Sequence, residues 1–225
     1  MARTDVFENR SDAGRQLAQR LQPIAEEQPV ILGLPRGGVP VAFEVAVALH
    51  VPLDVLVVRK VGAPHNPEFG VGAVGEGGVL LLDDSSLSAL GLSREDMEPT
   101  IEREREELER RLERYRSGRP GVPIEGRTAV VVDDGIATGV SATAAARVLR
   151  AREVARAVLA VPVGAPESVR SLEDVYDEVI TLRTPRGFMA VGAWYHDFGQ
   201  TTDDTVVDLL ARAYQQQGED DSDDT

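Results

Sequence analysis

Two adjacent carboxylates follow an apolar run in the second half of the chain. Residues 129–141 read AVVVDDGIATGVS. The apolar residues predict a buried strand whose carboxyl end presents Asp133 and Asp134, and open parallel sheets bind their ligands at that end. The turn that follows leads into a predicted helix, where main-chain N–H groups bind anions. Carboxylates beside such a phosphate cradle suit a ligand with phosphate and hydroxyl groups, or Mg²⁺.

Three other interpretations of the acidic pair can be compared with the sequence. The plainest is an acidic strand end that leads into an ordinary helix cap, and the residues alone leave it open. A response-regulator receiver domain also binds Mg²⁺ at a strand end, but it needs a lysine further along, and no lysine follows Lys60. A haloacid-dehalogenase phosphatase needs Asp-x-Asp, which Asp133-Asp134-Gly135 lacks. The receiver domain and the haloacid-dehalogenase phosphatase are therefore excluded.

The segment resembles the signature of the type I phosphoribosyltransferases, which is an apolar strand, an acidic pair, a short variable stretch and Thr-Gly-x-Thr/Ser. The resemblance implies that the protein binds 5-phosphoribosyl 1-pyrophosphate. Asp133 and Asp134 would hold the ribose 2′- and 3′-hydroxyls, with Mg²⁺ nearby. The 5′-phosphate would be held by main-chain N–H groups and hydroxyls of Ala137, Thr138, Gly139, Val140 and Ser141.

A second loop, residues 34–40, reads LPRGGVP and follows the first predicted strand. Type I phosphoribosyltransferases hold pyrophosphate on a loop in that position, so Arg36, Gly37 and Gly38 are candidate substrate-binding residues. Glycines let the backbone approach a phosphate closely, and arginine offers a forked set of donors. The resemblance also implies a cis peptide between Pro35 and Arg36. Read alone, the loop is better explained as a plain Gly-Gly turn, and its place beside the acidic motif in the predicted fold favours the substrate-binding role.

A third segment, residues 58–70, reads VRKVGAPHNPEFG and carries the only lysine of the chain. The resemblance makes it the mobile loop that closes over the reaction. A cationic lid would exclude water and stabilise the departing pyrophosphate. We therefore predict Arg59 and Lys60 as catalytic residues. His65 is a weaker candidate for an acid, because exposed loop histidines are common.

The acceptor would be recognised by a hood over the sheet, for which residues 184–202 are the candidate. A flat heterocycle could stack on Phe188, Trp194 or Tyr195, and the alternative is that these aromatic residues form the hood's own small core. Enzymes that act on 6-oxopurines usually carry an acidic residue where this chain has Ala137. Hypoxanthine and guanine are therefore expected to be poor acceptors, and the acceptor itself is not identified.

The elements that must position these residues alternate between strand and helix, which predicts an α/β fold with a doubly wound, mostly parallel sheet. We predict one domain over 1–217, with a helical insertion at 84–120, the hood at 184–202 and a disordered acidic tail at 218–225. The insertion contains a charged helix at 94–117. The predicted strands are 30–34, 53–59, 79–82, 128–132, 154–163 and 178–182, and the other helices are 11–24, 39–50, 139–150, 166–172 and 203–217.

The amino-acid composition excludes some classes of binding partner and some kinds of structural bond. The chain has a formal net charge of −14 and no cysteine, so nucleic acid is not an expected partner and disulfides are excluded. No segment is apolar enough to span a membrane, and a cytoplasmic protein is expected. A homodimer is left open.

Together these features predict a phosphoribosyltransferase that uses 5-phosphoribosyl 1-pyrophosphate and Mg²⁺ to modify an unidentified nitrogen nucleophile. Two alternatives remain. One is a regulator that binds phosphoribosyl pyrophosphate or a nucleotide without catalysis. The other is a phosphatase or nucleosidase that uses water as the acceptor.

Overall fold

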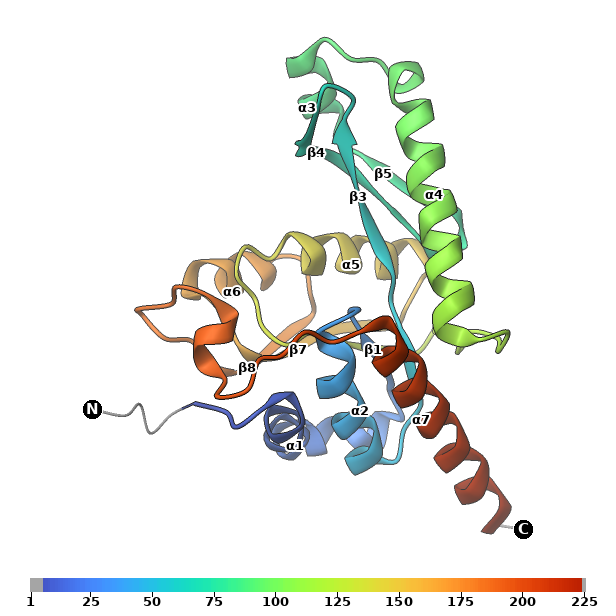
Figure 1. Ribbon diagram of the computed structural model, residues 1–225, viewed down its shortest axis with the longest axis vertical. Helices are drawn as coiled ribbons and strands as arrows, with labels where there is room; N and C mark the ends of the chain where they lie inside the picture. The colour runs from blue at the N-terminus through green and yellow to red at the C-terminus, as the bar shows by residue number, and fades with distance from the viewer. Residues whose placement is uncertain (1–5, 224–225) are drawn as a thin grey trace.

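A five-stranded parallel sheet forms the centre of the computed structural model, which describes residues 6–223 (Figure 1). The strand order is β2-β1-β6-β7-β8, and every neighbouring pair is parallel. The α/β fold class predicted from the sequence is therefore confirmed. The strands are β1 (Val30–Gly33), β2 (Leu53–Val55), β6 (Thr128–Val132), β7 (Arg156–Val163) and β8 (Glu178–Arg183).

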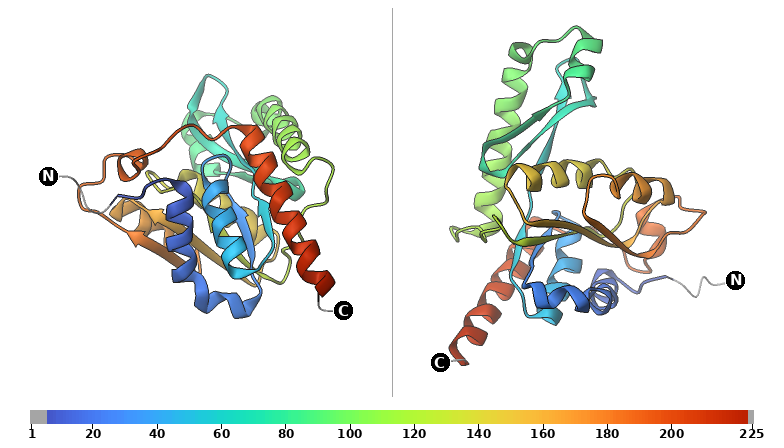
Figure 2. Two further views of the ribbon diagram at one scale, coloured as in Figure 1. Left: turned by 60° about the horizontal axis from the view of Figure 1, so that its bottom comes forward. Right: turned by 180° about the vertical axis from the view of Figure 1, so that it is seen from behind.

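Helices cover both faces of this sheet (Figures 1 and 2). Alternate residues of β6 explain why: Val130 and Val132 pack into one hydrophobic cluster, and Ala129 and Val131 pack into another. The first cluster includes side chains of α1 (Arg10–Leu21), α2 (Gly38–Leu49) and α7 (Asp203–Asp223); the second includes side chains of α5 (Val140–Ala151) and α6 (Pro166–Leu172).

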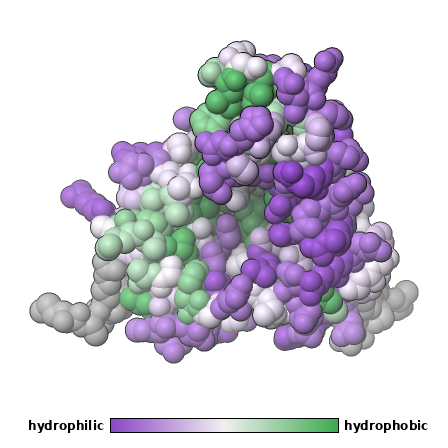
Figure 3. Space-filling model, turned by 45° about the horizontal axis from the view of Figure 1, so that its top comes forward, coloured by the Kyte–Doolittle hydropathy of each residue, from purple (hydrophilic) through white to green (hydrophobic). Residues whose placement is uncertain are grey.

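An arm rises from the body, and we define it as residues 58–116 (Figure 1). It contains an antiparallel sheet in the order β3-β4-β5, with the charged helix α4 beside it. Hydrophilic side chains cover the right side of the arm in Figure 3, where α4 lies, and this fits a solvated helix face. Its elements are β3 (Val58–Ala63), β4 (Asn66–Gly75), the 3₁₀ turn Glu76–Gly78, β5 (Val79–Leu82), α3 (Asp84–Leu90) and α4 (Arg94–Arg116).

The arm corrects two sequence predictions. The predicted strand 53–59 divides into β2 of the central sheet and the start of β3, and residues 60–78, which lie outside the predicted strands and helices, are mostly strand. The glycines caused the error. A Cβ at Gly72 would lie 2.2 Å from the Leu81 oxygen of the neighbouring strand, and one at Gly75 would lie 2.3 Å from a Val148 methyl of α5. Here glycine allows close packing between elements and does not mark a loop.

The hood, residues 184–202, is irregular as predicted, apart from the 3₁₀ turn Val191–Trp194. The N-terminal segment lies beside it, because Phe7 forms a parallel bridge with Tyr195 and the N–H of His196 donates to the Phe7 carbonyl at 2.8 Å. A further 3₁₀ turn, Gln22–Glu27, connects α1 to β1.

The C-terminal helix is longer than predicted. Residues 218–223 continue α7, where the sequence predicts a disordered tail, and residues 224–225 lie outside the described residues. The glutamines at 215–217 are good helix formers, and no proline follows Gly218 to end the helix. Within residues 6–223, no helix combines the length and hydrophobicity needed to cross a membrane.

Candidate functional site

The acidic pair lies where the order of the central strands reverses. β1 and β6 are neighbours, with Gly33 paired to Val132, so the segments that follow these two strands emerge side by side. One segment begins with Asp133 and the other is the glycine loop, residues 34–40. The N–H of Leu34 donates to the Val132 carbonyl at 2.9 Å and fixes the start of the loop. Open α/β sheets bind ligands in the crevice at such a reversal.

The two glycines of the loop are required by the acidic pair itself. A Cβ at Gly37 would lie 2.1 Å from Oδ2 of Asp134, and one at Gly38 would lie 2.4 Å from the Val132 carbonyl oxygen. The sequence analysis explained these glycines by close approach to a phosphate, whereas the structure shows close approach to the β6 strand end. The peptide between Pro35 and Arg36 is cis, as the resemblance implied.

Both carboxylates of the pair are held in surroundings that disfavour their charge. Burial, and then the adjacent Asp134 charge, raise the pKa of Asp133 well above its ordinary value. Burial also raises the pKa of Asp134, although the Arg10 guanidinium partly offsets this effect. The only hydrogen bond to the Asp133 side chain among the described residues comes from the N–H of Asp134, at 2.8 Å. A ligand that brings cations or hydroxyl donors would therefore satisfy groups that the free protein leaves poorly compensated.

Arg10 completes the site, and the sequence analysis missed it. Its Nε and Nη2 both lie 2.8 Å from Oδ2 of Asp134, and its Nη1 donates to the Gly199 carbonyl at 2.7 Å. Tyr195 adds a second contact, since its hydroxyl donates to the Asp134 carbonyl at 2.6 Å. No motif around residue 10 signals this role, because Arg10 and Asp134 are far apart in sequence and meet only when α1 packs beside the hood.

The phosphate turn, residues 137–141, leads into α5 as predicted. Gly139 has φ of 75°, a left-handed conformation that glycine adopts readily, and α5 begins at Val140. Among the described residues, the N–H groups of Thr138, Gly139, Val140 and Ser141 donate to no protein acceptor. The Thr138, Val140 and Ser141 side chains are exposed. Free donors at a helix N-terminus are what an anionic phosphate needs.

A cleft of about 470 Å³ joins the acidic pair to the glycine loop and the hood. The Arg36 side chain is half-exposed there, and its Nη1 lies 3.9 Å from Oδ1 of Asp203. Phe198 is also partly exposed and is covered by the Arg10 guanidinium at 3.9 Å from the ring centroid. The cleft is lined by Arg10, Arg36, Gly37, Asp134, Phe198, Gln200 and Thr201.

Mg²⁺ would depend on the ligand for part of its coordination. Within residues 6–223, no three His, Asp or Glu side chains are grouped closely enough to hold a metal ion by themselves. Asp133 and Asp134 supply hard carboxylate oxygens, which suit Mg²⁺ bound jointly with phosphate and water. The donor set therefore fits a magnesium ion carried by a phosphorylated ligand.

Arg59 and Lys60 do not line the cleft at the acidic pair. Both are on β3, in a separate cleft of the arm that also includes Thr100 of α4. Arg59 donates through Nε and Nη2 to Oε2 of Glu104, at 3.0 and 2.6 Å. Lys60 donates to the Glu68 carbonyl at 3.1 Å. Their role as a lid stays a prediction, because it requires these contacts to break.

The hood aromatic residues are mostly packed inside. Trp194 and Tyr195 are 5% and 6% exposed and form a cluster with Phe7, against which Phe188 is partly packed. The structure therefore favours the alternative that these residues form the hood's own core. Phe198, which the sequence analysis did not select, is the hood aromatic residue that lines the cleft.

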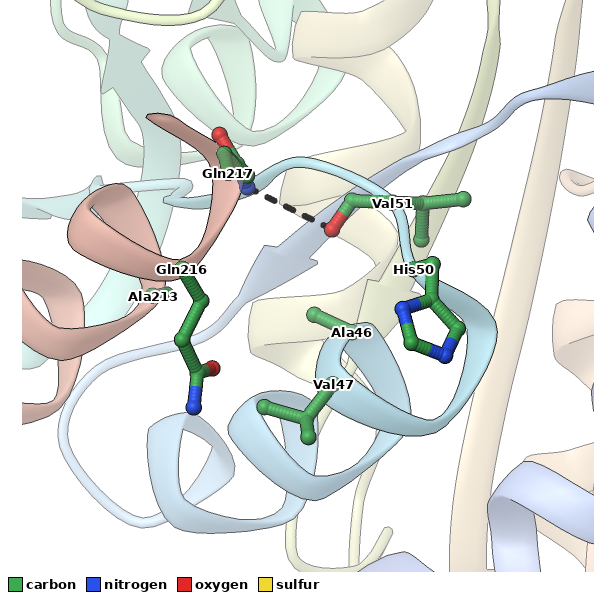
Figure 4. A pocket seen from close by; sticks show the side chains of 7 residues that line it. All are labelled: Ala46, Val47, His50, Val51, Ala213, Gln216 and Gln217. Carbon is green, nitrogen blue, oxygen red and sulfur yellow. Dashed lines mark hydrogen bonds between the residues drawn. The ribbon is translucent and has the colours of Figure 1, made fainter. Parts of the chain in front are cut away.

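A second cavity lies away from these residues, between the end of α2 and α7 (Figure 4). Its volume is about 190 Å³, and Gln217 closes one side by donating to the Val51 carbonyl at 3.4 Å. None of the predicted site residues lines it.

Comparison with known proteins identifies the family. Residues 5–193 match the model of the phosphoribosyl transferase domain. Two curated relatives from Mycobacterium tuberculosis, strains CDC 1551 and H37Rv, carry names that give them provisionally as phosphoribosyl transferases. Each is 52% identical over 209 residues, which is 93% of this chain and 47% of the relative. The chain thus spans about half the length of the curated relatives it matches.

A solved structure, that of the protein TT1426 from Thermus thermophilus, is similar over nearly the whole chain. It is 49% identical, with a TM-score of 0.84, and the match covers 92% of this chain and 98% of that one. The family match spans most of the chain and includes the glycine loop, the acidic pair and the phosphate turn. The resemblance stated from the sequence is therefore confirmed, and the chain belongs to the phosphoribosyl transferase family.

Proposed function

We propose that this protein transfers the phosphoribosyl group of 5-phosphoribosyl 1-pyrophosphate to a nitrogen nucleophile, with Mg²⁺ and with release of pyrophosphate. The main support for the proposal is that three binding segments lie together at one edge of the sheet. The acidic pair, the glycine loop and the phosphate turn with its free N–H groups all adjoin the end of β6. A ligand with a ribose diol and phosphates at both ends needs these three parts.

In the proposed reaction the bond from ribose C1 to the pyrophosphate oxygen breaks, a bond from C1 to the acceptor nitrogen forms, and the acceptor loses a proton. Asp133 and Asp134 orient the ribose through its hydroxyls, and the phosphate turn fixes the 5′-phosphate. Arg36 is the exposed cation of the cleft that would face the pyrophosphate. Bound Mg²⁺ supplies positive charge that stabilises the leaving group. Positioning and electrostatics supply most of the rate enhancement.

The arm contributes a lid in this proposal. Arg59 and Lys60 would leave Glu104 and Glu68 and approach the pyrophosphate when the arm closes. A Lys60→Gln variant tests this role: we expect turnover to fall by about 100-fold or more, with ligand binding retained. Unchanged turnover and binding would remove Lys60 from the mechanism.

The acceptor is a nitrogen heterocycle other than a 6-oxopurine in this proposal, because Ala137 offers no group to handle a ring proton. Phe198 is the aromatic residue that lines the cleft with Asp134, and it is the candidate surface for such a ring. Efficient nucleotide formation from hypoxanthine or guanine would contradict this assignment.

A non-catalytic regulator is the second candidate, and two contacts favour it. Arg10 occupies Oδ2 of Asp134, and the paired hydrogen bonds to Glu104 hold Arg59 on the arm. Such a protein would bind the sugar phosphate and report its presence without transfer.

A ³¹P NMR time course separates the two candidates. The samples contain 5-phosphoribosyl 1-pyrophosphate, Mg²⁺, the protein and a small-molecule cell extract, with an Asp133→Asn/Asp134→Asn variant as the control. Pyrophosphate that appears only with intact protein and extract would establish the transferase. Ligand signals that shift without turnover would favour the regulator, and unchanged spectra would contradict both.

A further inference from the structure

The Arg10 side chain contacts three other residues, namely Asp134, Gly199 and Phe198. It begins α1, and its guanidinium makes two contacts to Oδ2 of Asp134 and one to the Gly199 carbonyl while it lies over the Phe198 ring. The Arg10 and Asp134 side chains are only 13% and 14% exposed. Arg10 therefore joins three parts of the molecule, namely α1, the strand end that holds the acidic pair, and the hood.

This contact occupies a carboxylate oxygen at the proposed ribose site. Oδ2 of Asp134 already accepts a hydrogen bond from Nε of Arg10 and lies 2.8 Å from its Nη2, and on the loop side the Gly37 backbone leaves no room even for a methyl group. A carboxylate oxygen has limited lone-pair directions. A ligand hydroxyl or a ligand-bound cation therefore reaches Oδ2 only when the guanidinium moves away.

The charges at the site also indicate that Arg10 must move when the ligand binds. The two adjacent carboxylates are partly buried. Arg10 is the main group that lowers the pKa of Asp134 against the effect of burial, and its charge also lowers the pKa of Asp133, after the hydrogen bond from the Asp134 N–H. Arg10 thus acts as the counter-cation of the pair in the free protein. A ligand that carries Mg²⁺ brings its own positive charge to the same place, so the metal ion and the Arg10 guanidinium would compete for the Asp134 carboxylate.

We propose that Arg10 is a resident counter-cation that a magnesium-bound phosphoribosyl ligand displaces from Asp134, and that its displacement loosens the adjoining hood segment, residues 196–201. The inference rests on the proposed function. Because the guanidinium also holds the Gly199 carbonyl and the Phe198 ring, its movement is transmitted to the hood side of the cleft. Arg10 is a positioning residue in this scheme, and it makes ribose binding compete with an internal contact.

The test is a direct binding measurement without acceptor. Isothermal titration calorimetry at pH 8 compares the wild type, Arg10→Gln and Arg15→Gln for 5-phosphoribosyl 1-pyrophosphate with Mg²⁺. Arg15→Gln is the matched control, because Arg15 is on the same helix but is exposed and lies 3.7 Å from Glu44. We expect Arg10→Gln to bind about tenfold more tightly than the wild type, since the competing contact is gone. Arg15→Gln should bind like the wild type.

Hydrogen exchange of the hood gives a second readout that does not depend on activity. In the wild type, ligand should increase amide exchange in residues 196–201. In Arg10→Gln, exchange there should already be fast without ligand and should change little when ligand is added. If Arg10→Gln does not fold, Arg10→Lys serves instead: it retains the charge but cannot make the forked contact, so it should bind more tightly than the wild type by a smaller factor.

The outcomes separate this inference from the proposed function. Equal or weaker ligand binding by Arg10→Gln, with normal binding by the wild type, would overturn the inference alone and would make Arg10 a ligand-holding or purely structural residue. Hood exchange that ligand slows in the wild type would also overturn it. Absence of ligand binding by the wild type would overturn the proposed function and this inference with it.

Discussion

At the scale of single residues, Asp133 is a group that the free protein stabilises poorly. Its folded-state pKa is raised by burial and then by the Asp134 charge. The folded protein therefore holds a proton that the unfolded chain has released, and stability falls as the pH rises from the ordinary aspartate pKa through the raised one. Ligand-binding sites often contain groups that lower the stability of the free folded protein.

The first prediction is that Asp133→Asn stabilises the free protein at neutral pH while it abolishes ligand binding. We expect a gain of about 1 kcal/mol at pH 7, because asparagine does not ionise and the free-energy cost of the raised pKa is removed. The gain should shrink as the pH falls below the ordinary aspartate pKa, where the carboxyl is protonated in both states. Thermal unfolding at several pH values measures this. Asp174→Asn, on an exposed residue, is the control, and a loss of stability at every pH would contradict the argument.

The second prediction concerns the close approach at Gly38. A Cβ there would lie 2.4 Å from the Val132 oxygen and 2.8 Å from the Asp133 Cα, and both are backbone atoms that cannot rotate away. We expect Gly38→Ala to lower the free energy of unfolding by about 1–3 kcal/mol and to weaken binding of 5-phosphoribosyl 1-pyrophosphate. Urea unfolding and calorimetry measure these effects.

Gly187→Ala is the matched control for that variant. No atom lies within 4 Å of a Cβ at Gly187, so its stability should stay within about 0.5 kcal/mol of the wild type. Equal stability of the two variants would contradict the close contacts that the structure shows at Gly38.

At the scale of elements, a buried ion-pair network fastens the arm to the body. Arg116, at the end of α4, donates to Oδ2 of Asp54 on β2 at 2.8 Å and to Oε1 of Glu76 at 2.6 Å. Asp54 is 5% exposed and also accepts from the N–H groups of Val55 and Val122. The network thus ties the end of α4, the turn before β5 and the central sheet at one point.

The third prediction is that Arg116→Met destabilises the protein by about 3–5 kcal/mol, because Asp54 would keep a buried charge without its partner. Urea unfolding measures the change. The double variant Arg116→Met/Asp54→Asn should recover part of the loss, since the unpaired charge is gone. Arg110→Met removes an exposed pair with Glu107 and should cost less than about 1 kcal/mol. An equal cost for Arg110 and Arg116 would contradict the importance of burial.

At the scale of the whole molecule, Asp203 connects the arm, α7 and the glycine loop. It accepts from the Tyr115 hydroxyl and from Nη1 of Arg114, each at 2.8 Å, and lies 3.9 Å from Arg36. Burial, and then the hydrogen bond to Asp203 and its charge, raise the pKa of Tyr115 to about 12. Asp203 therefore links the base of the arm to Arg36, the residue that would face the pyrophosphate.

The fourth prediction is that Tyr115→Phe costs about 1.5–3 kcal/mol at pH 7, because one hydrogen bond to a charged acceptor is lost and the buried ring is kept. Since the folded-state pKa of Tyr115 is raised above the ordinary value of 10, its contribution is complete below pH 10 and is lost as the pH rises toward 12. The stability difference between wild type and variant should therefore shrink between pH 9 and pH 11.

Chemical denaturation at the two pH values measures that difference. Tyr214→Phe, on an exposed tyrosine of α7, is the control and should show no such trend. A stability difference for Tyr115→Phe that is the same at both pH values would contradict the hydrogen bond to Asp203.

The central sheet could be predicted from the sequence more closely than the arm. Runs such as 129–132 are apolar on both faces, and that pattern belongs to a strand buried between two helical layers. The arm strands contain Gly62, Gly70, Gly72 and Gly75, which are typical of loops in isolation. Only the packing of Gly72 against Leu81 and of Gly75 against Val148 explains why these residues are in strands.

The sequence by itself determined the acidic pair, the phosphate turn and the glycine loop, because each is a run of consecutive residues whose geometry follows from local backbone preferences. The family then followed from those runs. The tertiary structure alone decided that Arg10 pairs with Asp134, that Trp194 and Tyr195 are packed inside, and that Arg59 and Lys60 lie on the arm. These contacts join residues far apart in the chain, so they depend on how helices, hood and arm pack together and leave no mark in local sequence.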